Sequence, residues 1–294
     1  MFTLVAGHVA LVTCQRARGL DTDEPLLLAA LDALDVGVEV LDWDRPADWS
    51  VYDLAVIRST WDYAKRHEEF LAWAAATGAV TRVHNPVAML TWNTDKRYLT
   101  TLGDSGLRVI DTTFLAPGSD WPITELADSV VIKPSVSAGG QDTARYGPGE
   151  LQEARDHVAR LHSEKRVAMV QPYLAAIEDR DETALVYIGA TFSHAAAKGA
   201  LLGAGAAETG LFATESVAAR TASPAERALG DATMAWLSAS ELGAPLYARV
   251  DLLPDAEGLP RILEVELTEP SLFLETDPDA ADRMAAAIAG LLEM

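Results

Sequence analysis

The stretch YARVDLLPDAEGLPRILEVEL, residues 247–267, holds two apolar runs on either side of the turn sequence DAEG. The runs Leu246–Leu253 and Arg261–Leu267 are rich in aliphatic side chains, so the pattern predicts an antiparallel hairpin. Because both strands are largely apolar, the hairpin is expected to be buried. Antiparallel strands accompanied by helices indicate an α+β body.

Three acidic side chains interrupt the apolar pattern of this hairpin. Side chains two residues apart on a strand point to the same face, so Glu264 and Glu266 share a face, and Asp251 on the neighbouring strand can join them. Adjacent carboxylates repel one another strongly unless a cation lies between them. Hard oxygen ligands of this kind suit Mg²⁺, so the hairpin is a candidate metal site. The alternative is a solvated acidic edge, which the apolar surroundings disfavour.

The composition limits the class of protein. The chain has 294 residues, enough for two or three domains, of which 49% are hydrophobic and 23% charged, as is typical of a soluble globular protein. The 44 acidic and 23 basic residues give a net charge of −21. A surface this acidic repels phosphate backbones and anionic lipids, and no apolar run reaches the roughly 20 residues of a membrane span. Neither nucleic acid nor a membrane is therefore an expected partner.

Several common sites are excluded by their motifs. Cys14 is the single cysteine, so an intramolecular disulfide is impossible and a cytoplasmic location is expected. No CxxC or HExxH motif indicates structural zinc. None of the five lysines follows a glycine, which excludes a P-loop, and the G-x-S-x-G elbow of many hydrolases is absent.

The first ninety residues alternate between short apolar runs and helical segments, which predicts a parallel α/β sheet. Strands are expected at Val9–Cys14, Val38–Leu41, Leu54–Ser59 and Ala79–Val83, and helices at Asp23–Leu34 and Glu68–Ala76. In the α+β remainder, helices are expected at Thr94–Leu102, Glu150–His162, Pro224–Leu242 and Ala280–Leu292, and further strands at Val130–Lys133, Val167–Leu174, Thr183–Ile188 and Thr191–Ala197. The predicted domain segments are residues 1–93, 94–170 and 171–294.

Two lysines and a small-residue loop are candidates for binding phosphate groups. Lys133 ends an apolar strand and precedes a loop that contains Ser135, Gly139 and Gly140, through which backbone N–H groups can approach a phosphate. Lys96 lies near a predicted helix start. Either lysine alone is more often a solvated surface charge, but lysines are scarce in this chain.

The segment MVQPYLAAIED, residues 169–179, continues a predicted strand. It can offer backbone groups to a nucleobase and the carboxylate of Glu178 to a ribose. The alternative is an ordinary connection between two domains.

The order of these motifs resembles that of the ATP-grasp ligases, over roughly Thr94 to Leu267. The resemblance implies an ATP-grasp fold, ATP and Mg²⁺ as ligands, and an N-terminal α/β domain ahead of the ATP-binding part. It assigns ATP contacts to Lys96, Lys133, Gln171, the Leu174 backbone and Glu178, a position near the γ-phosphate to Lys198, an Arg-x-Asp pair to Arg249 and Asp251, and further metal ligands to Glu264 and Glu266. Glu266 departs from the usual asparagine, and Gln171 replaces an acidic residue.

A narrower resemblance involves the N-terminal motifs RSTWDY (Arg58–Tyr63), HNP (84–86) and WNTDK (92–96), together with FSHAAAKG and ELTEPSLFL. They are similar to the branch that contains the cycloserine-forming O-ureido-D-serine cyclo-ligase. This resemblance implies that ATP phosphorylates a substrate carboxylate and that an internal nitrogen then closes a five-membered ring. The expected partner is a small, amino-acid-like substrate, and a homodimer is the assembly that the family suggests.

The chemistry of such a site assigns roles to further residues. Arg249 is expected to stabilise the oxyanion of the tetrahedral intermediate, and Arg58 to bind the substrate carboxylate, unless it pairs with Asp62 or Asp53. A substrate pocket is predicted from Arg58, Ser59, Thr60, Asp62, Tyr63 and His194. For His194, a hydrogen-bonded structural role is the more common outcome.

Three other functions remain open from the sequence. The first is an intermolecular ligase that joins an amino acid to a separate amine. The second is a nucleotide-binding protein without turnover, against which the carboxylates and lysines argue. The third is a kinase that stops after phosphorylation.

Overall fold

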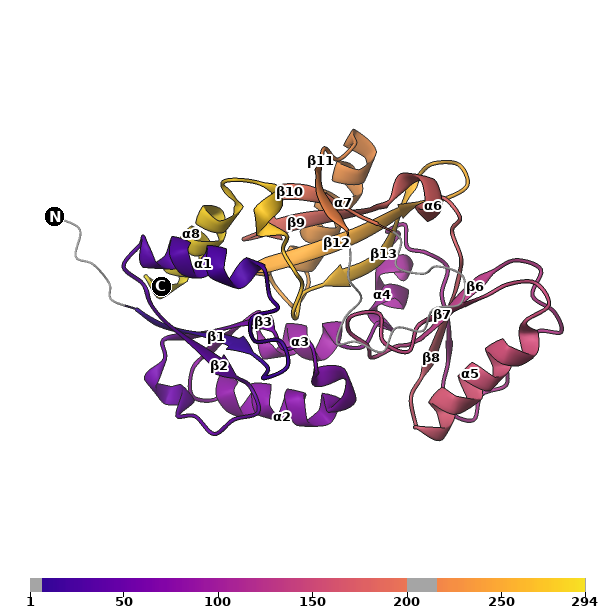
Figure 1. Ribbon diagram of the computed structural model, residues 1–294, viewed down its shortest axis with the longest axis horizontal. Coiled ribbons are helices and arrows are strands. Elements are labelled where there is room, and N and C mark those ends of the chain that lie inside the picture. The colour runs from indigo at the N-terminus through magenta and orange to yellow at the C-terminus, as the bar shows by residue number, and fades with distance from the viewer. Residues whose placement is uncertain (1–6, 200–215, 294) are drawn as a thin grey trace.

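The computed structural model of the protein describes residues 7–199 and 216–293, except for the side chains of residues 178 and 179. Within these ranges the strands form three sheets, which Figure 1 shows as an N-terminal layer, a small outlying sheet and a central C-terminal sheet. In the described part of the chain, no helix is both long and apolar enough to cross a bilayer.

The N-terminal sheet is parallel, with strand order β2-β1-β3-β4, as the sequence predicts. Its strands are β1 (His8–Thr13), β2 (Gly37–Asp42), β3 (Leu54–Ser59) and β4 (Arg82–His84), and its helices are α1 (Asp23–Asp32), α2 (His67–Gly78) and α3 (Val87–Asn93). Every residue of β3 is buried, the apolar run Leu54–Ile57 as well as the polar Arg58 and Ser59 that end the strand. The fourth strand is shorter than predicted and begins at Arg82, because residues 79–81 complete the turn after α2.

The small sheet is antiparallel, with order β5-β8-β6-β7. Its elements are β5 (Thr113–Leu115), β6 (Val130–Pro134), β7 (Ala144–Tyr146), β8 (Ala168–Pro172) and the helix α5 (Leu151–Ser163). One face of α5 packs on this sheet, since Ala154, Val158 and Leu161 share a core with Ile132 and Val170. The edge strands β5 and β7 are three residues each, too short for the sequence pattern to have predicted them.

The central sheet has five antiparallel strands in the order β11-β10-β9-β12-β13. Its elements are β9 (Glu182–Ile188), β10 (Thr191–Lys198), β11 (Val217–Arg220), β12 (Tyr247–Pro254) and β13 (Pro260–Glu266), with the helices α4 (Tyr98–Asp104), α6 (Ile177–Arg180), α7 (Pro224–Ala239) and α8 (Ala280–Leu292). The predicted hairpin is confirmed as β12 and β13. Helix α7 begins with proline in its first turn and a capping box between Ser223 and Glu226.

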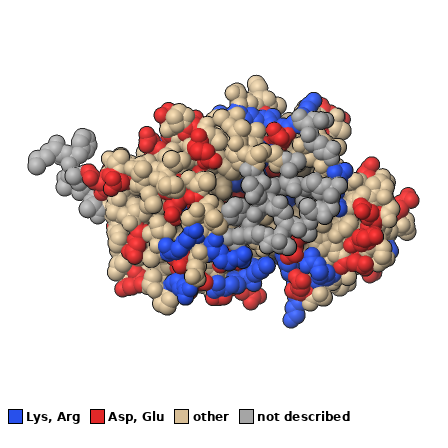
Figure 2. Space-filling view, in the orientation of Figure 1, with Lys and Arg blue, Asp and Glu red and all other residues tan. Residues whose placement is uncertain are grey.

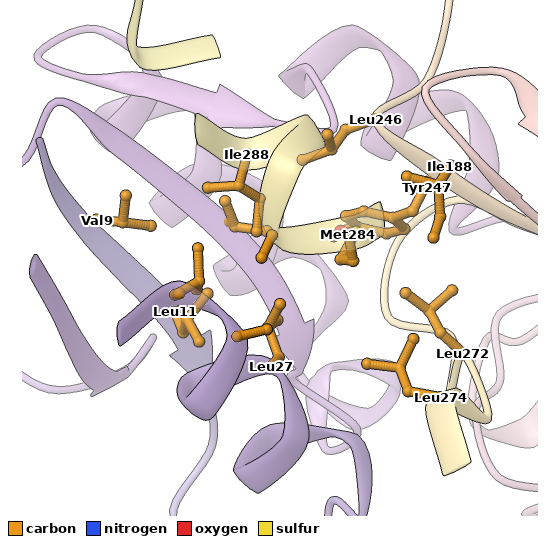
Figure 3. Packing of buried hydrophobic residues seen from close by; sticks show 14 of the residues in the cluster. Val9, Leu11, Leu27, Ile188, Leu246, Tyr247, Leu272, Leu274, Met284 and Ile288 are labelled. Atoms are coloured by element: carbon orange, nitrogen blue, oxygen red, sulfur yellow. The ribbon is translucent and has the colours of Figure 1, made fainter. Parts of the chain in front are cut away.

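The N-terminal and central sheets share one hydrophobic core. Val9 and Leu11 of β1, Leu27 of α1, and Met284 and Ile288 of α8 pack together between them, as Figure 3 shows. Helix α8, the last element of the chain, therefore lies between the first sheet and the last one. This packing holds the N-terminal layer against the sheet that carries the acidic hairpin.

The predicted helix Thr94–Leu102 is wrong in its first turn. Helix α3 ends at Asn93 and α4 begins at Tyr98, and the backbone N–H of Lys96 donates to the Ser135 carbonyl at 2.8 Å instead of continuing a helix. The break brings Lys96 beside the loop after β6. The division into segments 1–93, 94–170 and 171–294 stays a prediction, although its second boundary lies inside β8 and would fit better after Pro172.

Figure 2 shows acidic side chains spread over both ends of the molecule and basic side chains along the lower edge of its middle and along part of its upper edge. This distribution agrees with the formal charge of −21. Four further basic side chains lie inside the protein, in the site described next.

Candidate active site

A cavity of about 570 Å³ lies among the three sheets. It is lined by residues of the small sheet, the central sheet, the loop after β6 and the segment that follows β13. Twelve of the residues predicted from the sequence line it: Tyr63, Lys96, Lys133, Gly139, Gly140, Gln171, Leu174, Lys198, Arg249, Asp251, Glu264 and Glu266. The fold therefore brings the candidate phosphate-binding and metal-binding groups into one space.

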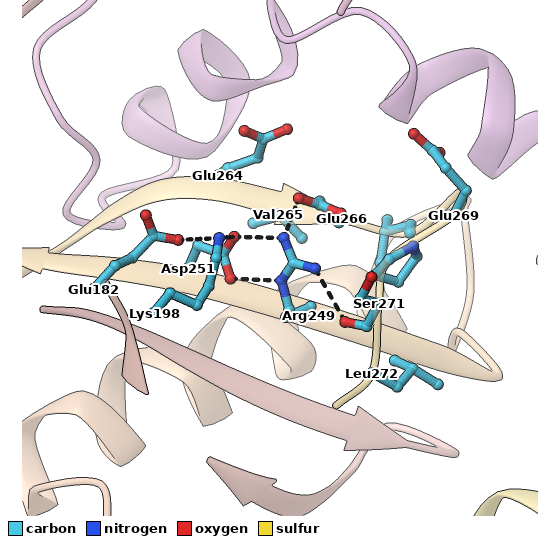
Figure 4. Close-up of polar contacts among 12 residues, drawn as sticks. Glu182, Lys198, Arg249, Asp251, Glu264, Val265, Glu266, Glu269, Ser271 and Leu272 are labelled. Carbon is cyan, nitrogen blue, oxygen red and sulfur yellow. Dashed lines mark hydrogen bonds and ion pairs between the residues drawn. The ribbon is translucent and has the colours of Figure 1, made fainter. Parts of the chain in front are cut away.

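The register of the hairpin places its charged residues opposite one another. Arg249 pairs with Glu266 across β12 and β13, and Asp251 pairs with Glu264. The guanidinium of Arg249 donates to both carboxylate oxygens of Asp251 at 2.8 Å and also donates to Glu266 (Figure 4). The cation that the three carboxylates require is thus supplied in part by Arg249 itself.

Lys198 enters the same network from β10. Its Nζ donates to Glu182 at 2.5 Å and to Asp251 at 2.9 Å, so it links β10, β9 and β12 (Figure 4). Glu182 was not predicted as a site residue, because the expected strand began one residue later. Its position directly opposite Lys198 in the β9–β10 pairing was the signal that could have identified it.

Lys96 and Lys133 share one counterion. The Nζ of Lys96 lies 2.9 Å from Glu264 and donates to the Ser137 carbonyl at 2.8 Å, and the Nζ of Lys133 lies 3.8 Å from Glu264. Burial lowers the pKa of Lys133, despite the attraction of Glu264. Two buried lysines with one carboxylate between them leave positive charge available for an anion.

The loop after β6 has the backbone that a phosphate-binding loop needs. Gly139 and Gly140 have φ angles of +60° and +70°, in the left-handed region that glycine adopts at little cost. A Cβ at Gly140 would meet nothing within 4 Å, so its backbone faces open space. Ser135, by contrast, is buried beneath the loop and is not part of the cavity lining.

Part of the cavity lining is apolar. Ile110, Val131, Leu253 and Leu263 form it together with the segment Gln171–Leu174, an apolar surface whose chemistry suits a nucleobase. The Gln171 side chain is 3% exposed and donates to Thr112 Oγ1 at 3.0 Å, so it stabilises the segment from behind. The side chain of Glu178 is outside the described residues, and its predicted role stays a prediction.

The cavity carries an excess of carboxyl groups. Of the described residues that line it, six are acidic and four are basic. Burial alone would raise the pKa of Asp251, but Arg249 and Lys198 hold it below the ordinary value. The pKa of Glu266 is raised, because burial and the nearby Glu264 and Asp251 outweigh Arg249. The site therefore has more negative charge than its own cations neutralise.

This charge balance fits a divalent cation. The donors are hard carboxylate oxygens on adjacent strands, which is the ligand chemistry of Mg²⁺. As the side chains stand, no group of three or more His, Cys, Asp or Glu residues in the described part of the chain is arranged to hold a metal ion. Asp251 and Glu266 instead share Arg249, so metal binding requires these carboxylates to turn from the arginine.

The residues predicted to bind substrate lie mostly behind the cavity wall. Arg58 is 4% exposed, pairs with Asp23 at 3.3 Å and donates to the Pro270 carbonyl at 3.0 Å. Arg58 forms an ion pair, which was the alternative considered from the sequence. Its partner, however, is Asp23 and not Asp62 or Asp53. Its Nη1 has no hydrogen-bond partner among the described residues.

The other predicted substrate residues have partners inside the fold as well, with one exception. Ser59 shares a hydrogen bond with Thr13, Asp62 accepts one from Trp43, and His194 bonds the Leu272 carbonyl at 2.8 Å. Thr60 is buried, and its hydroxyl has no partner among the described residues. Only Tyr63 of this set lines the cavity. His194 has the structural role that the sequence favoured.

Comparisons with known proteins point to the same family, one over the N-terminal part of the chain and two over nearly all of it. Residues 9–85 match the family model described as the N-terminal domain of the D-cycloserine synthetase DcsG. The chain is 37% identical to the cycloserine biosynthesis protein DcsG of Streptomyces lavendulae over 98% of this chain and 99% of that protein. The crystal structure of D-cycloserine synthetase DcsG superposes with a TM-score of 0.88 at 36% identity, covering 97% of this chain and all of that one.

More distant structures share the fold. D-alanine–D-alanine ligase from Bacillus anthracis, solved in complex with ATP, covers 98% of both chains with a TM-score of 0.70 at 15% identity. The ATP-grasp ligase PsnB, solved with a phosphomimetic variant of a minimal precursor, Mg and ADP, has a TM-score of 0.62 at 17% identity and covers 97% of this chain and 98% of that one. The ATP-grasp fold predicted from the sequence is thus confirmed.

Proposed function

The chain belongs to the D-cycloserine synthetase family of ATP-grasp ligases, and from that premise we propose that it closes the ring of D-cycloserine from O-ureido-D-serine. The chain is an ATP-grasp ligase, and ligases of this fold bind ATP and magnesium. The observation that carries the choice of substrate is the 37% identity over nearly the full length of both chains. A cavity that brings lysines, carboxylates and apolar side chains together supports it.

The proposed reaction begins at the substrate carboxylate. The γ-phosphoryl group of ATP passes to a carboxylate oxygen and gives ADP and an acyl phosphate, which is a good electrophile. The oxygen-bound nitrogen of the same molecule attacks the acyl carbon and loses its proton. Phosphate leaves with the electron pair of the broken C–O bond, and an isoxazolidinone ring is formed.

The ureido substrate carries a carbamoyl group on the attacking nitrogen, and the ring nitrogen of cycloserine carries none. Addition of water across that N–C bond must therefore release carbamic acid, which decomposes to carbon dioxide and ammonia. Because nucleophile and electrophile belong to one molecule, the enzyme needs to bind no second substrate, and correct folding of the substrate supplies much of the acceleration.

The residues of the cavity divide these tasks between them. Lys96, Lys133 and the backbone of the loop at Gly139 and Gly140 would bind the phosphate groups of ATP. The apolar end beside Leu174 would hold the base. Lys198 would lie near the transferred phosphoryl group, and Arg249 would stabilise the oxyanion that forms at the acyl carbon.

Asp251, Glu264 and Glu266 are the residues that would hold Mg²⁺, which neutralises phosphate charge when it is bound. Arg249 would then be released from Asp251 and Glu266 and become available to the reacting carboxyl group. Asp251 and Glu266 would thus act in two states: they hold the arginine before the nucleotide binds and would hold the metal afterwards, together with Glu264.

The direct test mixes the protein with ATP, MgCl₂ and O-ureido-D-serine, and measures ADP, ammonia and D-cycloserine by coupled assay and mass spectrometry. We expect one ADP and one ammonia per ring, with no requirement for an added amine. ATP cleavage only in the presence of a separate amine, with a linear amide as product, would establish the intermolecular alternative. Substrate-dependent ADP release without any ring or amide would indicate a kinase.

A further inference from the structure

The segment after β13, residues 268–275, forms one wall of the cavity. Its alternate side chains, Glu269, Ser271, Phe273 and Glu275, line the cavity. The residues between them, Leu272 and Leu274, are buried in the core shared with α8. As far as Leu272 the segment therefore has the alternation of an extended strand, although no neighbouring strand pairs with it along the described chain. Phe273 then has a φ of +50°, and Leu274–Thr276 form a short 3-10 helix.

Side chains from other elements take the place of a partner strand. The carbonyl groups of residues 268 to 272 accept hydrogen bonds, in order, from Tyr247, Trp61, Arg58, Arg249 and His194. The backbone N–H groups of Leu272 and Leu274 donate to Asp23. Every side chain on this wall is thus held by a fixed backbone, as a specificity-determining surface requires.

Of the two carboxyl groups on this wall that the proposed chemistry leaves unused, Glu269 is buried and Glu275 is exposed. Glu269 is 9% exposed, and its carboxyl group is hydrogen-bonded to Tyr63, while Trp61 holds its carbonyl at 3.0 Å. The basic residues of this region are committed to other carboxylates, Lys96 to Glu264 and Arg249 to Glu266. Burial and the nearby Glu266 raise the pKa of Glu269 to about 8, so the carboxylate form lacks sufficient positive charge around it.

We propose that Glu269, with the rings of Trp61 and Tyr63, binds the α-ammonium group of the substrate and makes the enzyme specific for amino acids. This inference rests on the proposed function for the type of reaction. It does not depend on which side chain the amino-acid substrate carries. An ammonium group supplies the missing positive charge and up to three donors. The two aromatic residues, which also line the cavity, add cation–π attraction.

The position of Glu269 also orients the substrate. Glu269 lines the same cavity as Arg249, the residue proposed to act at the acyl carbon, and Arg249 donates to the Ser271 carbonyl of this wall at 3.0 Å. The ammonium and carboxylate groups of one amino acid can therefore be held in the same cavity. A substrate bound at both groups has its side chain, which carries the nucleophilic nitrogen, confined to the remaining space. Recognition of the ammonium group would therefore favour ring closure as well as binding.

The experiment compares amino acids with their deamino counterparts, including O-ureido-D-serine and 3-(ureidooxy)propanoate, by ADP release. We expect the wild-type protein to prefer the amino form by about 100-fold in kcat/KM, and Glu269→Gln to lose most of that preference by slowing only the amino form. Tyr63→Phe, which keeps the carboxylate, should lose about tenfold or less. Glu257→Gln, an exposed glutamate at the tip of the hairpin, is the matched control and should keep the full preference.

Equal loss with both members of a pair would assign Glu269 a structural role and overturn the inference, as would an unchanged preference. Circular dichroism of each variant checks for misfolding. The variant Glu269→Asp keeps the charge and should therefore retain part of the preference for the amino form. If O-ureido-D-serine gives no turnover but another amino acid does, the proposed function fails, and the same comparison with that amino acid still tests Glu269.

Discussion

Asp251 and Glu264 face each other across β12 and β13, yet their carboxylates pair with different cations. Asp251 is bonded to Arg249 and Lys198, whereas Glu264 lies between Lys96 and Lys133. Each carboxylate therefore neutralises a separate part of the cavity. Substituting them should have separable effects on catalysis and on stability.

Glu264→Gln should abolish most Mg²⁺-dependent ADP release and also destabilise the protein by about 2 kcal/mol, because two buried lysines lose their shared counterion. Glu266→Gln should slow the reaction but leave the melting temperature nearly unchanged, since it also removes repulsion from Glu264 and Asp251. Thermal melts without nucleotide and ADP release at saturating Mg²⁺ measure the two effects. Normal turnover of Glu264→Gln would refute its role as a metal ligand.

Lys133→Ala should weaken ATP binding by about 1.5–3 kcal/mol, the usual cost of one charge-assisted contact. The reason is that Lys133 enters the cavity directly before the glycine loop and shares only one carboxylate with Lys96. Calorimetric titration with a non-hydrolysable ATP analogue and Mg²⁺ measures the change. The exposed Lys65→Ala is the control, and wild-type affinity in Lys133→Ala would exclude this strand from the nucleotide site.

His157 should make the small sheet sensitive to acid. Burial between α5 and β7, with a contribution from Arg160, lowers the pKa of His157 from 6.5 to about 4. Between those values the unfolded chain binds a proton that the folded one does not, so stability is full above pH 6.5 and falls as the pH drops toward 4. The expected loss is about 2 kcal/mol after allowance for solvent screening.

The neutral variant His157→Gln should lack this component. Its melting temperature should fall less than that of the wild type between pH 7 and pH 5. At pH 8 both side chains are neutral, so protonation of His157 no longer contributes to the difference between the two melting temperatures. Parallel pH profiles for the two proteins would show that His157 is protonated equally in the folded and unfolded states.

The sequence predicted those parts of the fold and site that depend on local pattern. The strand β3 and helix α8 were predicted with the bounds that the structure gives, since each is a continuous apolar or amphipathic run. The hairpin was predicted because a turn sequence separates two such runs. Its carboxylates share a face for the same local reason, the two-residue period of a strand.

The remainder depends on contacts between distant residues. Arg58 was expected to bind the substrate carboxylate or, as the alternative, to pair with Asp53 or Asp62 nearby. It pairs instead with Asp23, which lies 35 residues away on another element. Glu269 was overlooked because its segment has no strand partner and so no recognisable boundary. The alternation of polar and apolar residues from Glu269 to Leu272 was the available signal, and only the fold shows which of them meet the cavity.

Arg58 and Asp23 should act on catalysis through the wall that contains Glu269. Arg58 donates to the Pro270 carbonyl of this wall, and Asp23 accepts from the backbone of Leu272 and Leu274. The two side chains form an ion pair, and each of them holds the same segment. Arg58→Lys keeps the charge but not the planar fork and should lower kcat/KM about tenfold, with an increase in KM for the amino-acid substrate and not for ATP. Asp23→Asn should do the same.

Because the two residues hold one segment, the double variant should lose little more than either single variant, a coupling of about 1 kcal/mol or more in a double-mutant cycle. Additive losses would show that Arg58 and Asp23 act independently, and an increase in the KM for ATP would place their effect at the other end of the cavity.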